Sequence, residues 1–212
     1  MIFLYSCFVA YILGSIPFAF IYAKIFKRID IRKHGSGNIG ATNVLRILGP
    51  LAGTIVLILD MMKGFLPIVI MKLYFFEYIE ANSLLVCMAL CAILGHTFPI
   101  FMKFKGGKGV ATAAGVCLAL MPLSIIGALV VFITIVATTK YVSVGSLIAS
   151  LTLFVIRLIV YFFDKDIYTF SFIIMIVIFL IYKHKSNINR LMNGTENTIS
   201  FKRTKKDTKC VE

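Results

Sequence analysis

Long apolar runs separated by short polar segments dominate the pattern of this chain. The runs cover roughly residues 2–23, 51–71, 84–102, 110–139, 142–163 and 167–182. About 20 apolar residues are enough for a helix to cross the hydrocarbon core of a bilayer. The runs are continuous rather than alternating, which is not the pattern of transmembrane β-strands. We therefore predict an all-α fold, a polytopic transmembrane helical bundle.

The run 110–139 is too long for one span and is interrupted by Pro122. Proline removes a backbone donor and disfavours helix at the residue before it, so we expect a break at Met121. Two short spans hinged there place Lys108 and Lys140 on the same side of the membrane. The prediction is seven spans, with the N-terminus outside and the C-terminus cytoplasmic.

The placement of charge gives this orientation. The chain carries a net charge of +13 with 60% hydrophobic residues and a mean hydropathy of +0.97. Lys and Arg gather in segments 24–50 and 103–108 and in the tail after 182, whereas segment 72–83 holds Glu77 and Glu80. Cytoplasmic loops carry the excess of Lys and Arg, so the basic segments are predicted to be cytoplasmic. Because these cations border membrane spans, membrane lipids are the expected partner and nucleic acid is not.

The polar segments are too short to form a soluble domain. We expect residues 1–196 to form a single integral membrane domain and residues 197–212 a polar, basic, disordered cytoplasmic tail. The first run lacks a basic leader region and is interpreted as a retained helix. Cys87 and Cys91 lie one helical turn apart, but no His or carboxylate joins them, so no metal site is predicted.

A first polar motif precedes the second apolar run. Residues 34–46 read HGSGNIGATNVLR and mix glycines with small hydrogen-bonding side chains and an arginine. Glycines allow backbone amides to converge on an anion, and the arginine fork suits phosphate oxygens. The alternative is a turn of small residues at the membrane interface. The candidate phosphate-binding residues are Gly35, Ser36, Gly37, Asn38, Thr42, Asn43 and Arg46.

A second motif lies before the fourth run. Residues 103–115 read KFKGGKGVATAAG. The motif is not a Walker A loop, because Gly109 rather than Ser or Thr follows Lys108, so ATP hydrolysis is not implied. A glycine loop leading into a helix near Val110 still favours an anion. The candidates here are Gly106, Gly107, Lys108 and Gly109. His96, just upstream, is interpreted as a helix-end packing residue.

Two weaker motifs lie at the predicted cytoplasmic side. Residues 140–150 read KYVSVGSLIAS and place Ser143 and Ser146 one helical turn apart, where serines also serve as simple helix caps. Residues 184–196 read HKSNINRLMNGTE, and helical spacing puts His184 and Asn187 on one face. This segment could equally be an interfacial amphipathic helix with basic anchors. Glu196 is interpreted as a structural residue outside the site.

Charged residues inside the spans are few. Asp60 and Lys63 lie three residues apart and can neutralise each other. A neutralised pair that joins helices is the favoured interpretation, with a direct substrate role as the alternative. Arg157 is expected to snorkel or to meet a partner in the bundle. The sequence shows no carboxylate pair, Cys/His dyad or metal-ligand set, so catalysis would depend on positioning and electrostatic stabilisation, without a metal or cofactor.

At these motifs the chain resembles the bacterial acyl-phosphate:glycerol-3-phosphate acyltransferase family. The resemblance runs in order through nearly the whole chain and includes GSIPF, GSGNIGATN, the Asp60/Lys63 span, GHTFP, KGGKGVATAAG, YVSVGS and HKSNINRLMNGTE. It implies a seven-helix enzyme of the bacterial cell membrane with its active site facing the cytoplasm. The implied reaction transfers an acyl group from acyl phosphate to the 1-hydroxyl of glycerol 3-phosphate, the first acylation of phospholipid biosynthesis. The soluble enzyme that makes acyl phosphate is a candidate partner.

The resemblance also implies a set of catalytic positions, namely Ser36, Arg46, Lys108, Ser146, His184 and Asn187. We assign the phosphates to Arg46, Lys108 and the glycine amides. Ser36, Ser146 and Asn187 are expected to orient the acceptor and the developing oxyanion. His184 is expected to contact the acceptor or to act as general base, unless a substrate phosphate takes the proton.

A transporter of a phosphorylated metabolite is the alternative function. Basic loops at one face and the intramembrane Asp60 and Lys63 would suit it. The two halves of the sequence show no inverted repeat, and the polar motifs gather on one side of the membrane rather than at its midplane, which argues against transport.

Overall fold

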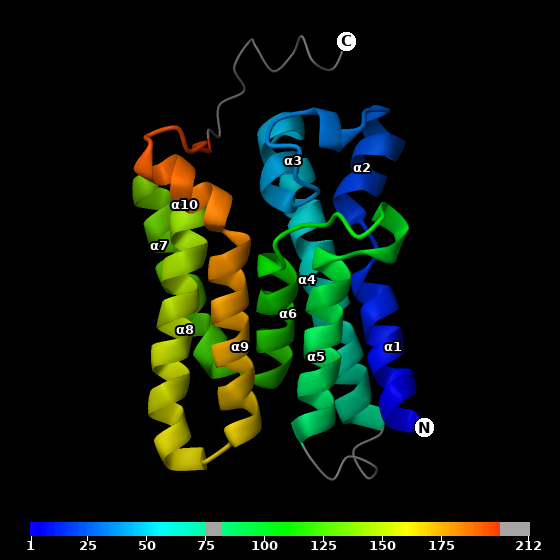
Figure 1. Cartoon of the computed structure of the whole chain (residues 1–212), viewed down its shortest axis with the longest axis vertical. Helices are drawn as coiled ribbons and strands as arrows, with labels where there is room; N and C mark the ends of the chain where they lie inside the picture. Colours follow the sequence, from blue (N-terminus) through cyan, green and yellow to red (C-terminus); the bar gives the residue numbers. More distant parts are fainter. Residues whose placement is uncertain (75–81, 200–212) are drawn as a thin grey trace.

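The computed structural model describes residues 1–74 and 82–199, and within these ranges every regular element is a helix. In Figure 1 the helices run along one long axis, with α6 between a group around α1, α4 and α5 and a group around α7, α8 and α9. The elements are α1 (Ile2–Gly14), α2 (Phe18–Lys27), η1 (Ile31–Lys33), α3 (Ala41–Leu48), α4 (Pro50–Tyr74), α5 (Asn82–Thr97), η3 (Ile100–Met102), α6 (Val110–Leu120), α7 (Pro122–Thr139), α8 (Val142–Asp164), α9 (Ile167–Lys183) and α10 (Lys185–Met192).

Most of the predicted apolar runs form helices long enough to cross a membrane. Among the described residues, five stretches meet the length and hydropathy expected of a span, namely Ile2–Lys27, Pro50–Tyr74, Asn82–Met102, Pro122–Thr139 and Val142–Asp164. A sixth is reached if α9 and α10, which meet at a bend of 53°, count as one span. The all-α membrane fold is therefore confirmed. Glu77 and Glu80 lie outside the described residues.

The predicted break in the run 110–139 falls between α6 and α7. Met121 adopts an extended conformation with φ −144°, and Pro122 occupies the first turn of α7, where its missing N–H costs no hydrogen bond. α7 has 18 residues, but α6 has only 11, about 16 Å of helix. α6 is thus about half the length that a bilayer core requires. α6 begins and α7 ends at the same end of the bundle. The first residues of α6 and of α8, which follows α7, border one cavity there.

Glycines allow the helices to approach closely. A Cβ at Gly115 of α6 would overlap the backbone of Met61 in α4, and one at Gly64 of α4 would overlap the Thr112 carbonyl. Gly14 of α1 faces α5 in the same way. In a bilayer, where lipid is as apolar as the helices, such backbone approach supplies much of the packing energy. α6 is therefore fixed against α4 along its length.

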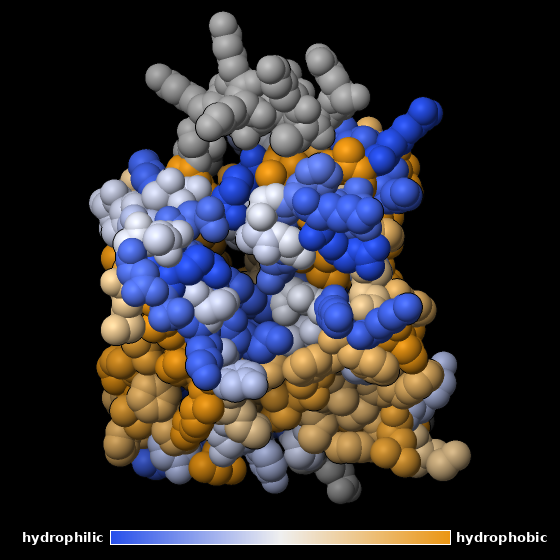
Figure 2. Space-filling view, turned by 45° about the horizontal axis from the view of Figure 1, so that its top comes forward, coloured by the Kyte–Doolittle hydropathy of each residue, from blue (hydrophilic) through white to orange (hydrophobic). Residues whose placement is uncertain are grey.

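The ends of the bundle carry its polar side chains. Figure 2 shows an apolar flank and a strongly hydrophilic end that is hollowed between the α2–α3 region and the α10 region. At the opposite end, buried Arg157 of α8 donates to Asp164 at 2.6 Å, so Arg157 has the bundle partner that the sequence led us to expect. The hollow at the polar end is where the predicted motifs meet.

Candidate active site

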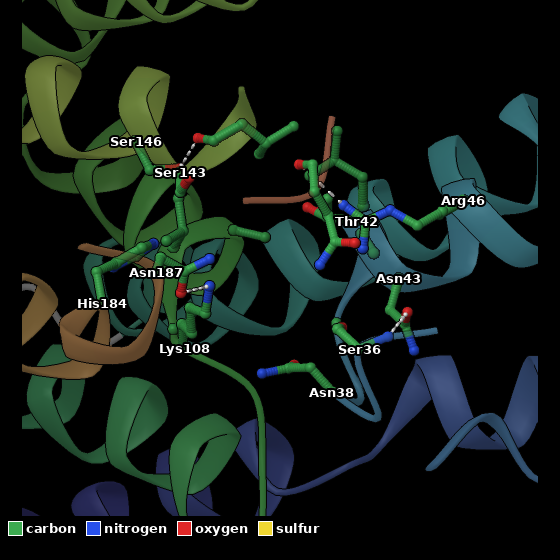
Figure 3. A pocket seen from close by; sticks show the side chains of 18 of the residues that line it. Ser36, Asn38, Thr42, Asn43, Arg46, Lys108, Ser143, Ser146, His184 and Asn187 are labelled. Carbon is green, nitrogen blue, oxygen red and sulfur yellow. Dashed lines mark hydrogen bonds between the residues drawn. The ribbon is translucent and has the colours of Figure 1, made fainter. Parts of the chain in front are cut away.

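A cavity of about 190 Å³ opens at the polar end. Figure 3 shows the loop before α3 on one side of it, α8 and α10 on the other, and Lys108 between them. It brings together segments that lie as far apart in sequence as Ser36 and Asn197. Ten of the fourteen predicted site residues line the cavity, namely Ser36, Asn38, Thr42, Asn43, Arg46, Lys108, Gly109, Ser146, His184 and Asn187.

Asn43 holds the first glycine loop in shape. Its side-chain oxygen accepts from the Ser36 amide at 3.0 Å, and its side-chain nitrogen donates to the His34 carbonyl at 3.0 Å. Gly35 and Gly37 have φ values of +59° and +69°, which favour glycine. A Cβ on Gly35 would also overlap the Asn43 side chain. These residues fold the loop so that Ser36 and Asn38 face the cavity.

Four predicted phosphate-binding glycines do not line the cavity, and the expectation of a nest of amides must be corrected. Gly106 and Gly107 donate their amides to the carbonyls of Thr97 and His96 at 3.1 and 3.2 Å, and the Gly37 amide donates to His34. Amides committed to carbonyls have no proton left for a ligand. The fourth, Gly35, packs against Asn43 as described. Gly109, with φ +87°, does border the cavity at the start of α6.

A hydrogen-bonded network crosses the cavity wall. Lys108 Nζ donates to Asn187 Oδ1 at 2.5 Å, and Asn187 Nδ2 donates to Glu196 Oε1 at 2.6 Å. Ser143 and Arg190 also donate to the Glu196 carboxylate, at 2.9 and 2.8 Å. The expectation that Glu196 lies outside the site is therefore wrong, because the chain reverses after α10 and returns this carboxylate to the cavity wall.

The cavity carries more positive than negative charge. Arg46, Lys108 and Arg190 line it together with two carboxylates, those of Glu196 and of Asp60, and Asp60 is already paired with Lys63. Burial lowers the pKa of Lys108 to about 8; attraction to Glu196 opposes this shift, and repulsion from Arg190 and Arg46 adds to it. Arg46 Nε is buried without a hydrogen-bond partner among the described residues. Buried donors of this kind are normally paired, so the site is built to receive an anion.

His184 presents one free nitrogen. Its Nδ1 lies 2.8 Å from the Leu180 carbonyl, which can only accept, so the proton is assigned to Nδ1. Burial, with a further contribution from the charge on Lys108, lowers the pKa of His184 to about 4. The imidazole is therefore neutral at pH 7, and its Nε2 lone pair can accept a hydrogen bond or a proton.

Asp60 and His96 form part of the cavity wall inside the bundle. Asp60 Oδ1 lies 2.7 Å from Lys63 Nζ, which confirms the predicted intrahelical pair. His96, interpreted from the sequence as a packing residue, lies with Nδ1 3.6 Å from Asp60 Oδ1. Sequence spacing could not predict this last contact, because residues 60 and 96 meet only once α4 and α5 pack.

An apolar groove continues from the cavity into the bundle. Five residues border both, namely Leu57, Val110, Ala111, Phe132 and Ser146. Beyond them the groove is lined by side chains of α6, α7, α8 and α9, including Leu129, Ala149 and Ile173. A cationic cavity and an apolar groove therefore share one boundary.

The segment after α10 also contributes. Asn197 borders the cavity, and the Ile199 amide donates to the Lys140 carbonyl at 3.0 Å with its side chain buried. The packed part of the chain thus extends past residue 196 to Ile199. The rest of the predicted tail, with Cys210, lies outside the described residues.

An apolar helical bundle with a cationic cavity at one end and an apolar groove beside it has the features of an integral membrane protein suited to anionic amphiphiles. The comparisons with known proteins make this specific. The family described as glycerol-3-phosphate acyltransferase matches residues 4–194. The chain belongs to this family and is an acyltransferase.

Individual relatives agree over almost the full length. The glycerol-3-phosphate acyltransferase of Fusobacterium nucleatum is 44% identical over 199 residues, which are 93% of this chain and 99% of that protein. The Bacillus subtilis (strain 168) protein of the same name is 43% identical, with coverage of 91% and 95%. The crystal structure of PlsY (YgiH), an integral membrane glycerol 3-phosphate acyltransferase in its glycerol 3-phosphate form, superposes with a TM-score of 0.85 at 38% identity, covering 94% and 96%. Its lysophosphatidic acid form gives a TM-score of 0.83 at 37% identity, covering 95% and 97%.

Proposed function

We propose that the protein transfers an acyl group from acyl phosphate to the 1-hydroxyl of glycerol 3-phosphate. The products are 1-acyl-glycerol 3-phosphate and inorganic phosphate. The observation that carries the proposal is the shared boundary between the cationic cavity and the apolar groove. Both substrates carry phosphate, and one also carries a long apolar chain, so a phosphate site and a chain site must meet at the reacting carbonyl.

The donor supports a mechanism without an enzyme nucleophile. An acyl phosphate is already activated, because phosphate is a good leaving group. The acceptor hydroxyl attacks the carbonyl carbon, a C–O bond to the acceptor forms, and the C–O bond to phosphate breaks. The enzyme has to hold the two anions close together and stabilise the charge that develops, which oriented cations and donors do well in a water-poor site.

The residue roles follow from the contacts. Arg46 offers its guanidinium, whose Nε is unpaired among the described residues while Nη2 donates to the Asn197 carbonyl at 3.5 Å, and Lys108 offers its ammonium to the phosphates. Ser36 orients the acceptor and the oxyanion. Ser146, whose hydroxyl donates to the Val142 carbonyl at 2.8 Å, orients the acceptor by accepting from its hydroxyl. Asn187 has both ends of its amide engaged, by Lys108 and by Glu196, so its part is to orient Lys108. His184 accepts the hydroxyl proton at Nε2, with a substrate phosphate as the competing acceptor.

The same proposal includes the membrane topology. The cavity faces the cytoplasm, because basic segments border it, and the chain crosses the membrane seven times. α6 and α7 together leave the cavity end and return to it, so Lys108 and Lys140 lie on one side. The N-terminus is then outside. Labelling of single cysteines at exposed Lys105 and Lys165 in sealed cells tests this topology, with Lys105 expected to be protected from an impermeant reagent and Lys165 to react.

The activity is tested with purified protein, glycerol 3-phosphate and palmitoyl phosphate, with released phosphate and lysophosphatidate measured together. Equal yields of both products are expected, with no product when acyl-CoA replaces the acyl phosphate. Lys108→Ala should abolish both products. The matched control is Lys105→Ala, which removes an exposed cation from the same loop and should leave the yields unchanged. A failure of wild-type protein to form lysophosphatidate from acyl phosphate would contradict the proposal.

A further inference from the structure

The buried ion pair of α4 has no role in the proposed acyl transfer. The carboxylate of Asp60 and the ammonium of Lys63 are 1% and 6% exposed, and they lie 2.7 Å apart. Removing two charges from water costs several kcal/mol per ion, and well-packed apolar residues often stabilise a fold as well or better. The role of the ion pair is therefore inferred from its contacts with the rest of the bundle.

The pair joins three parts of the chain. Lys63 Nζ donates to the Ile16 carbonyl at 2.8 Å and lies 5.5 Å from the ring of Phe18. Ile16 is in the interruption between α1 and α2, where a carbonyl has no helical partner. On the other side, Asp60 Oδ1 faces His96 Nδ1 at 3.6 Å. This separation is too long for a hydrogen bond, so the pair acts on His96, at the end of α5, through packing and its electrostatic field.

His96 in turn contacts the turn that carries Lys108. The Gly107 amide donates to the His96 carbonyl at 3.2 Å, and the Gly106 amide donates to the Thr97 carbonyl at 3.1 Å. The imidazole of His96 also fills the space where a Cβ on Gly107 would be, so that added carbon would overlap Nε2, Cε1 and Cδ2. Gly107, the residue before Lys108, is therefore held by its backbone hydrogen bond, and its lack of a side chain leaves room for the imidazole to pack against it.

We propose that Asp60, Lys63 and His96 are positioning residues that hold the Gly107 turn so that Lys108 reaches Asn187 and the substrate phosphates. This inference rests on the proposed function, because it assigns the residues that position Lys108, the cation proposed to bind the substrate phosphates. It also gives Gly107 a role that differs from the phosphate contact expected from the sequence. The continuous set of contacts runs from Ile16 through the ion pair, His96 and Gly107 to Lys108.

A pair of compensating substitutions tests the contact directly. Gly107→Ala adds the carbon that overlaps the imidazole and should lower kcat/KM at least tenfold. His96→Ala removes the imidazole and should also lower kcat/KM, because the Gly107 turn loses the side chain that packs against it. The double variant His96→Ala/Gly107→Ala should be more active than Gly107→Ala alone, since the added methyl group then has room. A double variant no more active than Gly107→Ala overturns the proposal.

The pH profile supplies a measurement that a purely structural role would not move. The groups that face Lys108 are Glu196, Arg190, Arg46 and His184. If His96 sets the position and burial of Lys108, His96→Ala should shift the alkaline limb of kcat/KM to higher pH as the ammonium gains water. His96→Asn, which keeps a polar side chain beside Gly107, should retain a limb near that of wild type. An alkaline limb unchanged in His96→Ala contradicts the proposal.

Asp164→Asn is the matched control, since it removes the partner of buried Arg157 at the opposite end of the bundle. It should lower the unfolding temperature in detergent without changing the pH profile. All rates are expressed per folded protein, measured by size-exclusion chromatography and thermal unfolding. If wild-type protein shows no acyl transfer, the proposed function is contradicted. If wild-type protein is active but His96→Ala does not relieve the defect of Gly107→Ala, only the positioning role is contradicted.

Discussion

Lys108 and Asn187 are 79 residues apart in sequence, yet Lys108 Nζ donates to Asn187 Oδ1 at 2.5 Å across the candidate active site. The amide nitrogen of Asn187 then donates to Glu196, so one side chain separates and orients opposite charges. Without it, Lys108 and Glu196 could pair directly, and the cation would be withdrawn from the substrate phosphates.

Asn187→Ala tests this separation. A hydrogen bond to a charged group contributes about 1.5–3 kcal/mol, so the loss should lower kcat/KM by roughly 10- to 150-fold. Steady-state kinetics with palmitoyl phosphate and glycerol 3-phosphate measure the effect. The control is Asn189→Ala on the outer face of α10, which should have wild-type rates. Wild-type activity in Asn187→Ala would show that Lys108 needs no orientation from α10.

The pH dependence should report on Lys108. Its pKa is lowered to about 8, so the ammonium is charged below pH 8 and loses its proton as the pH rises through that value. Because phosphate binding needs the charge, kcat/KM should fall above about pH 8. Lys108→Arg keeps its charge at all accessible pH values and should move this limb beyond pH 10, whatever its activity at pH 7. A limb that stays near pH 8 in Lys108→Arg would assign it to another group.

His184 should act as a base over most of the pH range. Its pKa of about 4 keeps the imidazole neutral at pH 5 and above, so protonation should lower kcat/KM only near pH 4. General bases contribute about 10²–10⁴-fold, and His184→Gln should lose activity within that range together with the acid limb that His184 causes. An unchanged pH profile in a partly active His184→Gln variant would show that His184 is not the base, and that a substrate phosphate accepts the proton of the acceptor hydroxyl.

Arg46 should be required for phosphate binding. Its buried, unpaired Nε makes it a candidate for bidentate contact, and Arg46→Ala should cost about 3 kcal/mol, roughly 10²-fold in kcat/KM. Arg46→Lys keeps a charge without the planar fork and should recover only part of the loss. Arg32→Ala, which removes an exposed arginine paired with Asp30, serves as the control. Full activity in Arg46→Ala would refute the assignment.

The apolar groove should select acyl-chain length. Ala149 lines it, and Ala149→Leu would occupy part of the space for the chain. Blocking the space for part of an apolar chain typically changes specificity by about 10-fold or more. The turnover of palmitoyl phosphate relative to decanoyl phosphate should therefore fall about tenfold. Ile148→Leu, at the neighbouring exposed position, is the control. An unchanged ratio would place the acyl chain elsewhere.

The sequence was sufficient for features that depend on neighbouring residues. Hydropathy located the spans, Pro122 located the break before α7, and the spacing of Asp60 and Lys63 within one helix predicted their pairing. Each of these depends on local geometry. The short reach of α6 follows from the same local signals, because the helix begins after Gly109 and ends before the break at Met121. Its close packing against α4 could not be predicted in this way, because it depends on contacts between separate helices.

The roles of the glycines and of Glu196 needed the tertiary structure. A glycine that frees an amide for a ligand and one that admits a neighbouring imidazole look the same in sequence, and Gly107 proved to be the second kind. Glu196 reaches the cavity only because the chain turns at Gly194, with φ +66°, and folds back along α10. His96 and Asp60 meet through the packing of two helices, which single-sequence spacing does not reveal.

The ion pair inside α4 has a consequence for how this protein enters the membrane. A single charge at the centre of a spanning helix raises the free energy of insertion by about 2.5–3.5 kcal/mol. Asp60 and Lys63 lie on the same helical face at i and i+3, so they can neutralise each other within α4 before any other helix has arrived. The middle of the segment Pro50–Tyr74 can therefore enter the bilayer without a net charge, with Lys72 as a further cation in the last turn of α4. The charges of Asp60 and Lys63 become available for contacts with other helices only during later assembly.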